Sequence, residues 1–302
     1  MSRLYEALQR ADRERKTAPA TEVDQVVDPV LDPVLNPEIE EPPPAKPGVV
    51  LDDIARYEWK PSIDTFPTLA DRGAGVEQFR GLRSRIYQAR YESPLKTILV
   101  SSGMPSEGKS FITANLAVSL ARNTVNNILL IDADLRRPTL HKLLGTPNTP
   151  GLSEYLQGAV ELEAILQRDR MPKTGDAPST GNISNLTFIP SGVCGDHSSE
   201  LVANHRIDEL LAAVSPHFDW ILIDSPPVLA VTDAVELSHA ADAVMLIARG
   251  ARTPYDVAQQ TQAAFGNARI LGFVLNDVKE VPRGGYNYYD YYGAASATNR
   301  AK

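Results

Sequence analysis

A short glycine-containing turn between an apolar strand and an amphipathic helix constrains this sequence more than any other stretch. The apolar run at residues 98–100 predicts a buried strand, and the four-residue spacing of apolar positions within residues 109–122 predicts a helix. Between them lies Gly103-Met-Pro-Ser-Glu-Gly-Lys-Ser110. A phosphate-binding loop has the same order: a strand, two glycines at this spacing, Lys-Ser and then a helix.

Each residue type of this loop suits the binding of phosphates. Gly103 and Gly108 let the backbone turn tightly and approach an anion without a Cβ atom in the way. The loop amides and the helix N-terminus present partial positive charge. Lys109 is expected to reach the outer phosphates, and the Ser110 hydroxyl to bind Mg²⁺. The alternative is a glycine turn that binds nothing, and the flanking elements favour phosphate binding. We also expect nucleotide contacts from neighbouring positions, namely Ser106, Glu107, Phe111 and Asn276.

Strand and helix patterns alternate along most of the remaining chain. This alternation predicts an α/β fold, with a mainly parallel sheet sandwiched by helices as in P-loop NTPases. Strands are expected at 96–101, 127–132, 185–190, 219–224, 243–248 and 270–275. Helices are expected at 75–92, 109–122, 139–145, 152–168, 200–213, 232–239 and 254–265. Residues 169–183 carry no periodicity and predict an exposed loop.

Two further apolar strands end in aspartate. The first is followed by Asp132 and Asp134, and the second ends at Asp224. Ligands of open α/β sheets bind outside the carboxyl ends of the strands, so all three carboxylates are expected to face the nucleotide and its Mg²⁺. The alternative is that each aspartate caps the helix that follows it. Because two such strands accompany the phosphate loop, the pattern favours metal and water positioning.

Composition excludes several classes of function. The 302 residues carry a formal net charge of −8 and show no basic field of the kind that nucleic acid needs. The single cysteine, Cys194, permits no internal disulfide, and the five histidines lack zinc-ligand spacing. No stretch reads as a membrane span or a signal peptide, so we expect a cytoplasmic protein.

The two ends of the chain differ from its centre. Residues 1–16 predict a short helix of mixed charge, either solvated or docked on a partner. Residues 17–70 predict a disordered, acidic, proline-rich linker, whose end Trp59 and Phe66 pin onto the next domain. The nucleotide-binding domain is expected at 71–280 and a flexible tail at 281–302.

The tail holds five of the eleven tyrosines of the chain. Two glycines precede them, so the segment is expected to move, and a mobile tyrosine-rich end is a good acceptor of phosphoryl groups. The alternative is a sticky aromatic tail or an edge strand, and the phosphate loop in the same chain favours the acceptor. The predicted phosphoacceptors are Tyr286, Tyr288, Tyr289, Tyr291 and Tyr292.

These motifs together resemble the bacterial tyrosine kinases. Leu129-Leu-Ile-Asp-Ala-Asp-Leu-Arg136 is similar to the extra Walker motif of that family, and Ile221-Leu-Ile-Asp-Ser-Pro-Pro227 to its Walker B motif. Glu77-x-x-Arg80-x-x-Arg83 resembles the motif through which members assemble rings. The tyrosine tail resembles their autophosphorylated end. The opening Met-Ser-Arg-Leu-Tyr-Glu-Ala-Leu is similar to stand-alone members tied to exopolysaccharide export.

The resemblance implies an ATP- and Mg²⁺-dependent tyrosine autokinase that phosphorylates its tail in trans and regulates exopolysaccharide polymerisation and export. Lys109, Asp132, Asp134 and Asp224 are then the expected catalytic residues, and Ser110, Asp134 and Asp224 the expected metal ligands. Asp132 is the candidate that orients the tyrosine hydroxyl, although roles among the three aspartates are interchangeable. Arg136 and Arg137 are expected to contact phosphate or acceptor, or to pair with surface acids.

The resemblance also implies partners. It implies a homo-oligomeric ring built through Glu77, Arg80 and Arg83, for which the alternative is a weak pair of Glu77 with Arg80 within one helix. A separate membrane co-polymerase or activator is expected to hold the protein at the inner face of the membrane, and a cognate tyrosine phosphatase to reverse the modification.

Two other functions fit parts of the sequence. A division- or partition-type ATPase would carry a lysine directly after the first loop glycine, where this chain has Met104. A nucleotide-gated regulatory subunit of an export complex, without significant kinase activity, remains the second alternative. Phosphate added to the purified protein, and absent from Lys109→Ala, separates the kinase from both.

Overall fold

A computed structural model describes residues 51–122, 125–170, 183–194, 198–202 and 206–278. Eight strands of this part of the chain form one sheet, in the order β1-β4-β5-β3-β6-β2-β7-β8. The central strands are parallel, and β4 pairs with β5 in the antiparallel sense. The strands are β1 (Ala55–Tyr57), β2 (Thr97–Ser102), β3 (Ile128–Asp132), β4 (Gln167–Asp169), β5 (Leu186–Ile189), β6 (Trp220–Asp224), β7 (Ala243–Arg249) and β8 (Ile270–Asn276).

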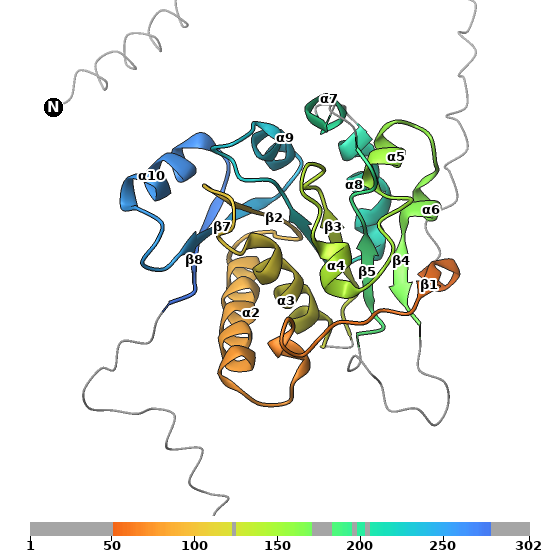
Figure 1. Ribbon diagram of the computed structural model, residues 1–302, viewed down its shortest axis with the longest axis horizontal. Coiled ribbons are helices and arrows are strands. Elements are labelled where there is room, and N and C mark those ends of the chain that lie inside the picture. The colour runs from red at the N-terminus through yellow and green to blue at the C-terminus, as the bar shows by residue number, and fades with distance from the viewer. Residues whose placement is uncertain (1–50, 123–124, 171–182, 195–197, 203–205, 279–302) are drawn as a thin grey trace, which may run out of the picture. The chain divides into compact units, whose positions relative to one another are not determined.

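Helices cover both faces of this sheet (Figure 1). They are α2 (Ala74–Glu92), α3 (Lys109–Ala121), α4 (Leu140–Leu144), α5 (Leu152–Leu156), α6 (Leu162–Ile165), α7 (Ser198–Val202), α8 (Arg206–Val214), α9 (Asp233–His239) and α10 (Tyr255–Ala264). Three short 3₁₀ helices lie at Leu51–Asp53, Pro67–Leu69 and Ser215–His217. In Figure 1, α2 and α3 lie side by side in front of the sheet.

The core consists of two hydrophobic clusters, one on each face of the sheet. Because successive side chains of a strand point to opposite faces, Ile98 and Val100 join the cluster under α2 and α3, whereas Leu99 joins the cluster under α8 and α9. The helix α3 is buried from Ile112 to Ala121 on nearly all sides, because α2 covers the side that faces away from the sheet. This burial fixes the start of α3, and with it the glycine loop.

Most elements agree with the sequence. The predicted α/β class with a mainly parallel sheet between helices is confirmed, and each of the six predicted strands is present within two residues of its expected limits. One helix prediction is wrong: residues 152–168 form α5, α6 and the strand β4, with Gly158 at a positive φ of 75° between the two helices. The helix predicted at 200–213 is represented by α7 and α8.

The residues just before α2 also differ from expectation. The predicted linker extends to residue 70, whereas the structure places β1 at the edge of the sheet and buries Trp59 and Phe66. Residues 55–57 therefore belong to the sheet, and the 3₁₀ helix Pro67–Leu69 packs against α2 and α3. The pinning role expected for Trp59 and Phe66 is confirmed, because both are buried in the cluster under these helices. The N-terminal helix predicted at 1–16, the linker up to residue 50 and the tyrosine tail lie outside the described residues.

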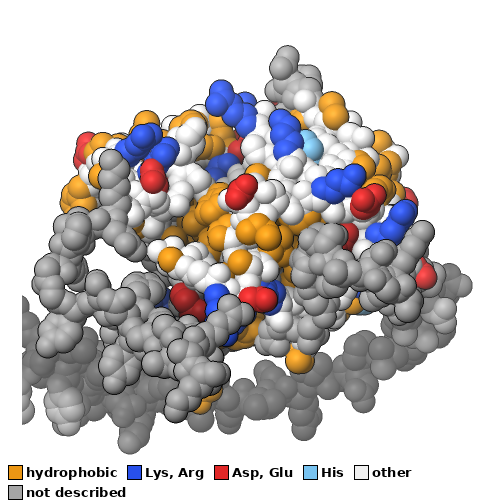
Figure 2. All heavy atoms as spheres, turned by 60° about the horizontal axis from the view of Figure 1, so that its bottom comes forward, with side chains coloured by type: hydrophobic (Ala, Val, Ile, Leu, Met, Phe, Trp, Pro, Cys, Tyr) orange, Lys and Arg blue, Asp and Glu red, His pale blue; other side chains and the backbone are white. Residues whose placement is uncertain are grey.

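Both signs of charge occur on the surface. On the face shown in Figure 2, basic and acidic side chains of the described residues lie around a central hydrophobic area. Among the described residues, no helix has the length and the apolar character needed to cross a bilayer.

Two glycine substitutions should have opposite effects on stability. A Cβ atom at Gly151 would come within 2.5 Å of the Pro190 carbonyl oxygen and 2.7 Å of Gly192 Cα, neither of which can move freely. We expect Gly151→Ala to lower the free energy of unfolding by about 1–3 kcal/mol through overpacking. Gly81 lies on α2 with open space around it, so Gly81→Ala should raise that free energy by up to about 1 kcal/mol. Urea denaturation of both variants measures the difference, and equal effects would contradict this packing.

Candidate active site

The site lies where the carboxyl ends of three neighbouring strands meet the glycine loop. β2 runs into the loop, β6 pairs with β2, and β3 pairs with the other side of β6. The register aligns Val100 with Asp224, and Asp224 with Asp132. The sequence placed these groups at one edge because parallel strands end together, and the structure brings them together there.

The loop itself is held in a constrained backbone conformation. Ser106 and Gly108 have positive φ values of 65° and 92°. The Glu107 side chain is buried and turns away from the cleft, accepting a hydrogen bond of 2.9 Å from the Met104 amide and another from the Thr253 hydroxyl. Asn276 donates from its Nδ2 atom to the Glu107 carbonyl oxygen at 3.0 Å. Glu107 and Asn276, both expected at the nucleotide, therefore brace the loop from behind.

Lys109 joins the loop to the carboxylates. Its Nζ atom lies 2.8 Å from Asp134 Oδ2, and both side chains are largely buried. Burial by itself lowers the pKa of Lys109, but the carboxylates of Asp224 and Asp134 outweigh it and raise the pKa above its ordinary value. Lys109 is therefore charged at neutral pH. Lys109 is the first residue of α3, so its side chain starts from a rigid element.

Asp224 has an unused buried oxygen. Its Oδ1 atom accepts a bond of 3.4 Å from the Thr113 hydroxyl, whereas Oδ2 is buried and has no partner among the described residues. Burial raises the pKa of this carboxyl, and Lys109 only partly opposes the rise. An orphaned carboxylate oxygen near the Ser110 hydroxyl suits a hard cation such as Mg²⁺. The described residues contain no cluster of three or more His, Cys, Asp or Glu with metal-binding geometry, so few protein ligands would hold such a cation.

Asp132 has a different environment from the one expected. Its Oδ2 atom accepts bonds from the Thr139 amide at 3.2 Å and the Leu140 amide at 3.1 Å, at the start of α4. Its Oδ1 atom accepts from the Asp134 amide at 3.3 Å. Burial and the neighbouring Asp224 raise the pKa of Asp132 well above its usual range. Asp132 therefore binds amides at the start of α4, where Thr139 is the N-cap residue, and its side chain is not among those that line the cleft. Its catalytic role stays a prediction.

A cleft of about 600 Å³ opens in front of the loop. Ser106, Gly108, Lys109 and Ser110 form one side of the cleft, and Asp134 lies beside them. The rest of the lining is mostly apolar and comes from α3, α4 and the segment after β6: Phe111, Leu143, Pro226, Pro227, Ala230 and Val231. The cleft therefore places a polar, cationic loop next to a hydrophobic wall.

The two arginines after Asp134 have separate environments. The Nε atom of Arg136 lies 3.2 Å from Oδ2 of the buried Asp233, and its Nη2 atom donates to the Ser199 hydroxyl at 2.6 Å. It fastens α9 and α7 to the loop after β3. The side chain of Arg137 has no such anchor among the described residues, and its amide donates to Asp134 Oδ1 at 3.0 Å. Both arginines are exposed and line the cleft. Sequence alone left their roles open.

Some residues of the cleft were missed from the sequence. Thr113 contacts Asp224, and Thr139 lines the cleft with a buried hydroxyl that has no partner among the described residues. A threonine four residues after the loop lysine does not indicate a site residue, because threonines occur in many helices. The two prolines after Asp224 were visible in the sequence, but not the hydrophobic wall that they form.

The residues expected at an oligomer interface lie on α2, away from this cleft. Arg80 pairs with Glu77 within the helix at 2.6 Å, which is the alternative arrangement considered for the sequence. Arg83 donates instead to the Ser119 carbonyl oxygen at the end of α3. Arg80 remains half exposed, so it is open to further contacts.

Comparisons with known proteins agree with this geometry. The family model of the AAA domain matches residues 95–255. The chain is 35% identical over 211 residues to the tyrosine-protein kinase ptk of Acinetobacter johnsonii, covering 69% of this chain and 27% of that protein. It is 32% identical over 215 residues to the tyrosine-protein kinase YwqD of Bacillus subtilis, covering 70% of this chain and 85% of that protein. The solved structure of the kinase domain of the Escherichia coli tyrosine kinase ETK matches with a TM-score of 0.62 and 30% identity. The match covers 73% of this chain and 83% of that structure.

The length of the match differs between these relatives. The chain spans only 25–29% of the length of several curated kinases that it matches, and most of YwqD.

Proposed function

Because this chain belongs to the bacterial tyrosine kinase family, we propose that it transfers the terminal phosphoryl group of ATP to tyrosine side chains. The single observation that carries the proposal is the junction of Lys109, Asp134 and the orphaned Asp224 oxygen at the glycine loop. Phosphoryl transfer needs mainly positioning and charge stabilisation, and this junction offers both.

We assign the donor side of the reaction to the loop. The amides of the loop and Lys109 bind the outer phosphates, which replace Asp134 as the partner of the ammonium group. Ser110 and Asp224 would hold Mg²⁺, which when bound would supply positive charge beside the phosphates. Thr113 keeps the Asp224 side chain in place.

We assign the acceptor side to the hydrophobic wall and Asp134. The phenol ring packs against Pro226, Pro227 and Val231, and its hydroxyl meets Asp134, which lines the cleft. The sequence favoured Asp132 for this role, and we prefer Asp134 because it lines the cleft, whereas the hydrogen bonds shown for Asp132 come from three backbone amides. A phenol has a pKa of about 10, so the carboxylate orients the hydroxyl, with late proton transfer.

The wider context follows from the sequence. We propose that the acceptors are the tail tyrosines of a neighbouring copy, that Arg80 and Arg83 contribute to a ring, and that a separate membrane protein holds the ring at the inner face of the membrane. In that setting the chain regulates exopolysaccharide polymerisation and export, and a phosphatase resets the tail. The alternative is a nucleotide-gated regulatory subunit that binds ATP in the same cleft and transfers nothing.

A mixing experiment tests transfer between copies. One variant, Lys109→Ala, keeps the tail and lacks the donor lysine, and a second carries Tyr→Phe at the five tail positions and keeps the loop. We expect neither to gain phosphotyrosine alone, and the Lys109→Ala copy to gain it when the two are mixed with Mg-ATP. Phosphopeptide mapping of residues 281–302 identifies the acceptors. If ADP forms and no tyrosine is modified in the mixture or the wild type, the regulatory alternative replaces the kinase.

A further inference from the structure

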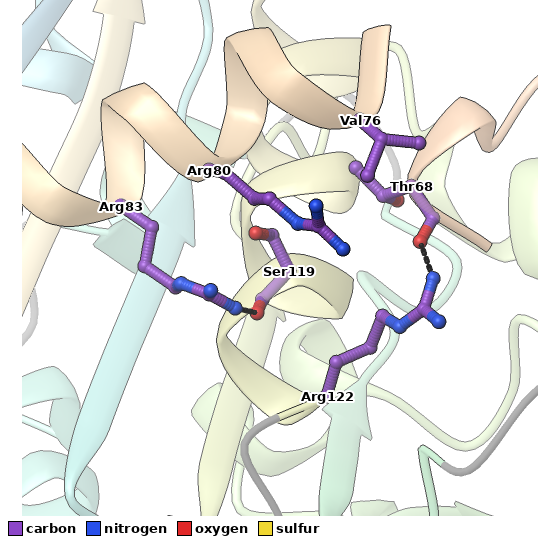
Figure 3. A pocket seen from close by; sticks show the side chains of 6 residues that line it. All are labelled: Thr68, Val76, Arg80, Arg83, Ser119 and Arg122. Carbon is purple, nitrogen blue, oxygen red and sulfur yellow. Dashed lines mark hydrogen bonds between the residues drawn. The ribbon is translucent and has the colours of Figure 1, made fainter. Parts of the chain in front are cut away.

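A second, strongly cationic cavity lies between α2 and the end of α3. It has a volume of about 170 Å³ and is lined by Thr68, Val76, Arg80, Arg83, Ser119 and Arg122. Figure 3 shows the guanidinium group of Arg80 reaching into the space between Arg83 and Arg122. Among the residues that the structure describes, no acidic side chain lines this cavity.

Neutral partners hold two of the three guanidinium groups. Arg83 donates to the Ser119 carbonyl oxygen at 2.5 Å, and Arg122 donates to the carbonyl oxygens of Thr68 and Ala70, each at 2.6 Å. A carbonyl group satisfies a donor without cancelling its charge. The carboxylates that pair with these arginines, Glu77 and Asp71, are largely exposed to solvent. Three guanidinium groups therefore converge on this cavity, and the two that form ion pairs do so with carboxylates that solvent also reaches.

The neighbouring space indicates which anion fits. Arg80, Arg83 and Arg122 also line an adjoining, more open cavity of about 490 Å³, together with Ser84 and Tyr87. The inner cavity has room for a phosphate group, and the outer one has room for an aromatic ring beside Tyr87. Arginine clusters with planar donor forks are the usual recognition elements for phosphorylated side chains.

We propose that Arg80, Arg83 and Arg122 bind the phosphate of a phosphotyrosyl side chain. The proposal rests on the proposed function for the source of such a group, the modified tail of another copy. A phosphate monoester carries about −1.5 to −2 charges at neutral pH, so it can replace the exposed carboxylates of Glu77 and Asp71 as the partner of Arg80 and Arg122 while it also binds Arg83. Because Arg80 and Arg83 are also the expected ring contacts, a phosphorylated tail in this cavity would compete with ring assembly.

Binding of a synthetic phosphopeptide tests this site directly. A fluorescent copy of residues 284–293 with phosphotyrosine at position 289 is titrated with the full chain, with saturating Mg-ADP present to occupy the loop. We expect Arg80→Gln to weaken binding about tenfold or more, since a charge-assisted pair is lost. Arg85→Gln is the matched control, because Arg85 is exposed on the same helix and lines neither cavity. It should leave the affinity unchanged.

Three results would overturn the proposal. The first is equal loss of affinity in Arg80→Gln and Arg85→Gln, which would indicate only general charge attraction. The second is equal binding of phosphoserine and phosphotyrosine peptides, because no ring would then occupy the outer cavity. The third is binding to phosphatidylserine vesicles that depends on Arg80 when the peptide does not bind. Since the peptide is synthetic, its binding is measured whether or not the chain phosphorylates itself, so the kinase proposal stands or falls separately.

Discussion

Replacing Lys109 by alanine is expected to lower the rate of tyrosine phosphorylation by about 10²–10³-fold or more, the cost of removing one preorganised donor from a phosphoryl-transfer site. Lys109 is the basic side chain that meets Asp134 at the loop, and its ammonium group lies within the cleft rather than in bulk solvent. A cation from solvent would not be held in the position of the Lys109 ammonium group, because the lysine side chain fixes that position. Intact-mass measurement after incubation with Mg-ATP gives the rate.

The same substitution should weaken the fold. Breaking a buried ion pair by removing one partner costs about 3–5 kcal/mol, because Asp134 stays buried without its cation. The variant Lys109→Arg controls for this effect, since it keeps a positive charge and should recover most of the stability while activity stays low. A Lys109→Ala protein that unfolds like the wild type and is phosphorylated at the same rate would contradict the assigned role.

Replacing Asp224 by asparagine should separate activity from stability. The substitution removes the charged oxygen proposed for Mg²⁺ and should lower phosphorylation by about 10²-fold, a typical loss for a charge-stabilising group. An asparagine carbonyl can still accept the bond from Thr113, and the oxygen that is lost has no partner among the described residues. We therefore expect Asp224→Asn to be at least as stable as the wild type at pH 7 without Mg²⁺.

The pH dependence gives the sign of this effect. Burial raises the pKa of Asp224 in the folded state above its ordinary value, so the unfolded chain ionises more readily. The contribution of such a group to stability is present below the unfolded pKa and is lost as the pH rises through the folded pKa. The stability advantage of Asp224→Asn should thus grow from acidic to neutral pH in urea denaturation. Asp256→Asn, at an exposed position of α10, is the matched control for the substitution itself.

The sequence was informative where one physical requirement determines the residue type. Short apolar runs such as residues 98–100 predicted the central strands, because strands of a parallel sheet are buried on both faces. The strands β1 and β4 have three residues each and include charged side chains, so they give no such signal. The edge position of β1 depends on its pairing with β4, which joins residues more than a hundred positions apart in the sequence.

The candidate site was predictable in composition but not in detail. The loop and the three aspartates follow from the strand ends, whereas the different environments of Asp132 and Asp224 do not. A carboxylate that caps α4 and one with an orphaned oxygen occupy equivalent places in the sequence. Arg122 could not be associated with Arg80 and Arg83, because only the packing of α3 on α2 brings it to them.

Intact mass of the purified chain tests the central claim most directly. The protein is first treated with a tyrosine phosphatase and then incubated with Mg-ATP beside Lys109→Ala. The account predicts mass increments of whole phosphoryl groups in the wild type, mapped to tyrosines between Tyr286 and Tyr292, and none in the variant. A wild-type mass that stays unchanged while ATP is bound or hydrolysed would contradict it.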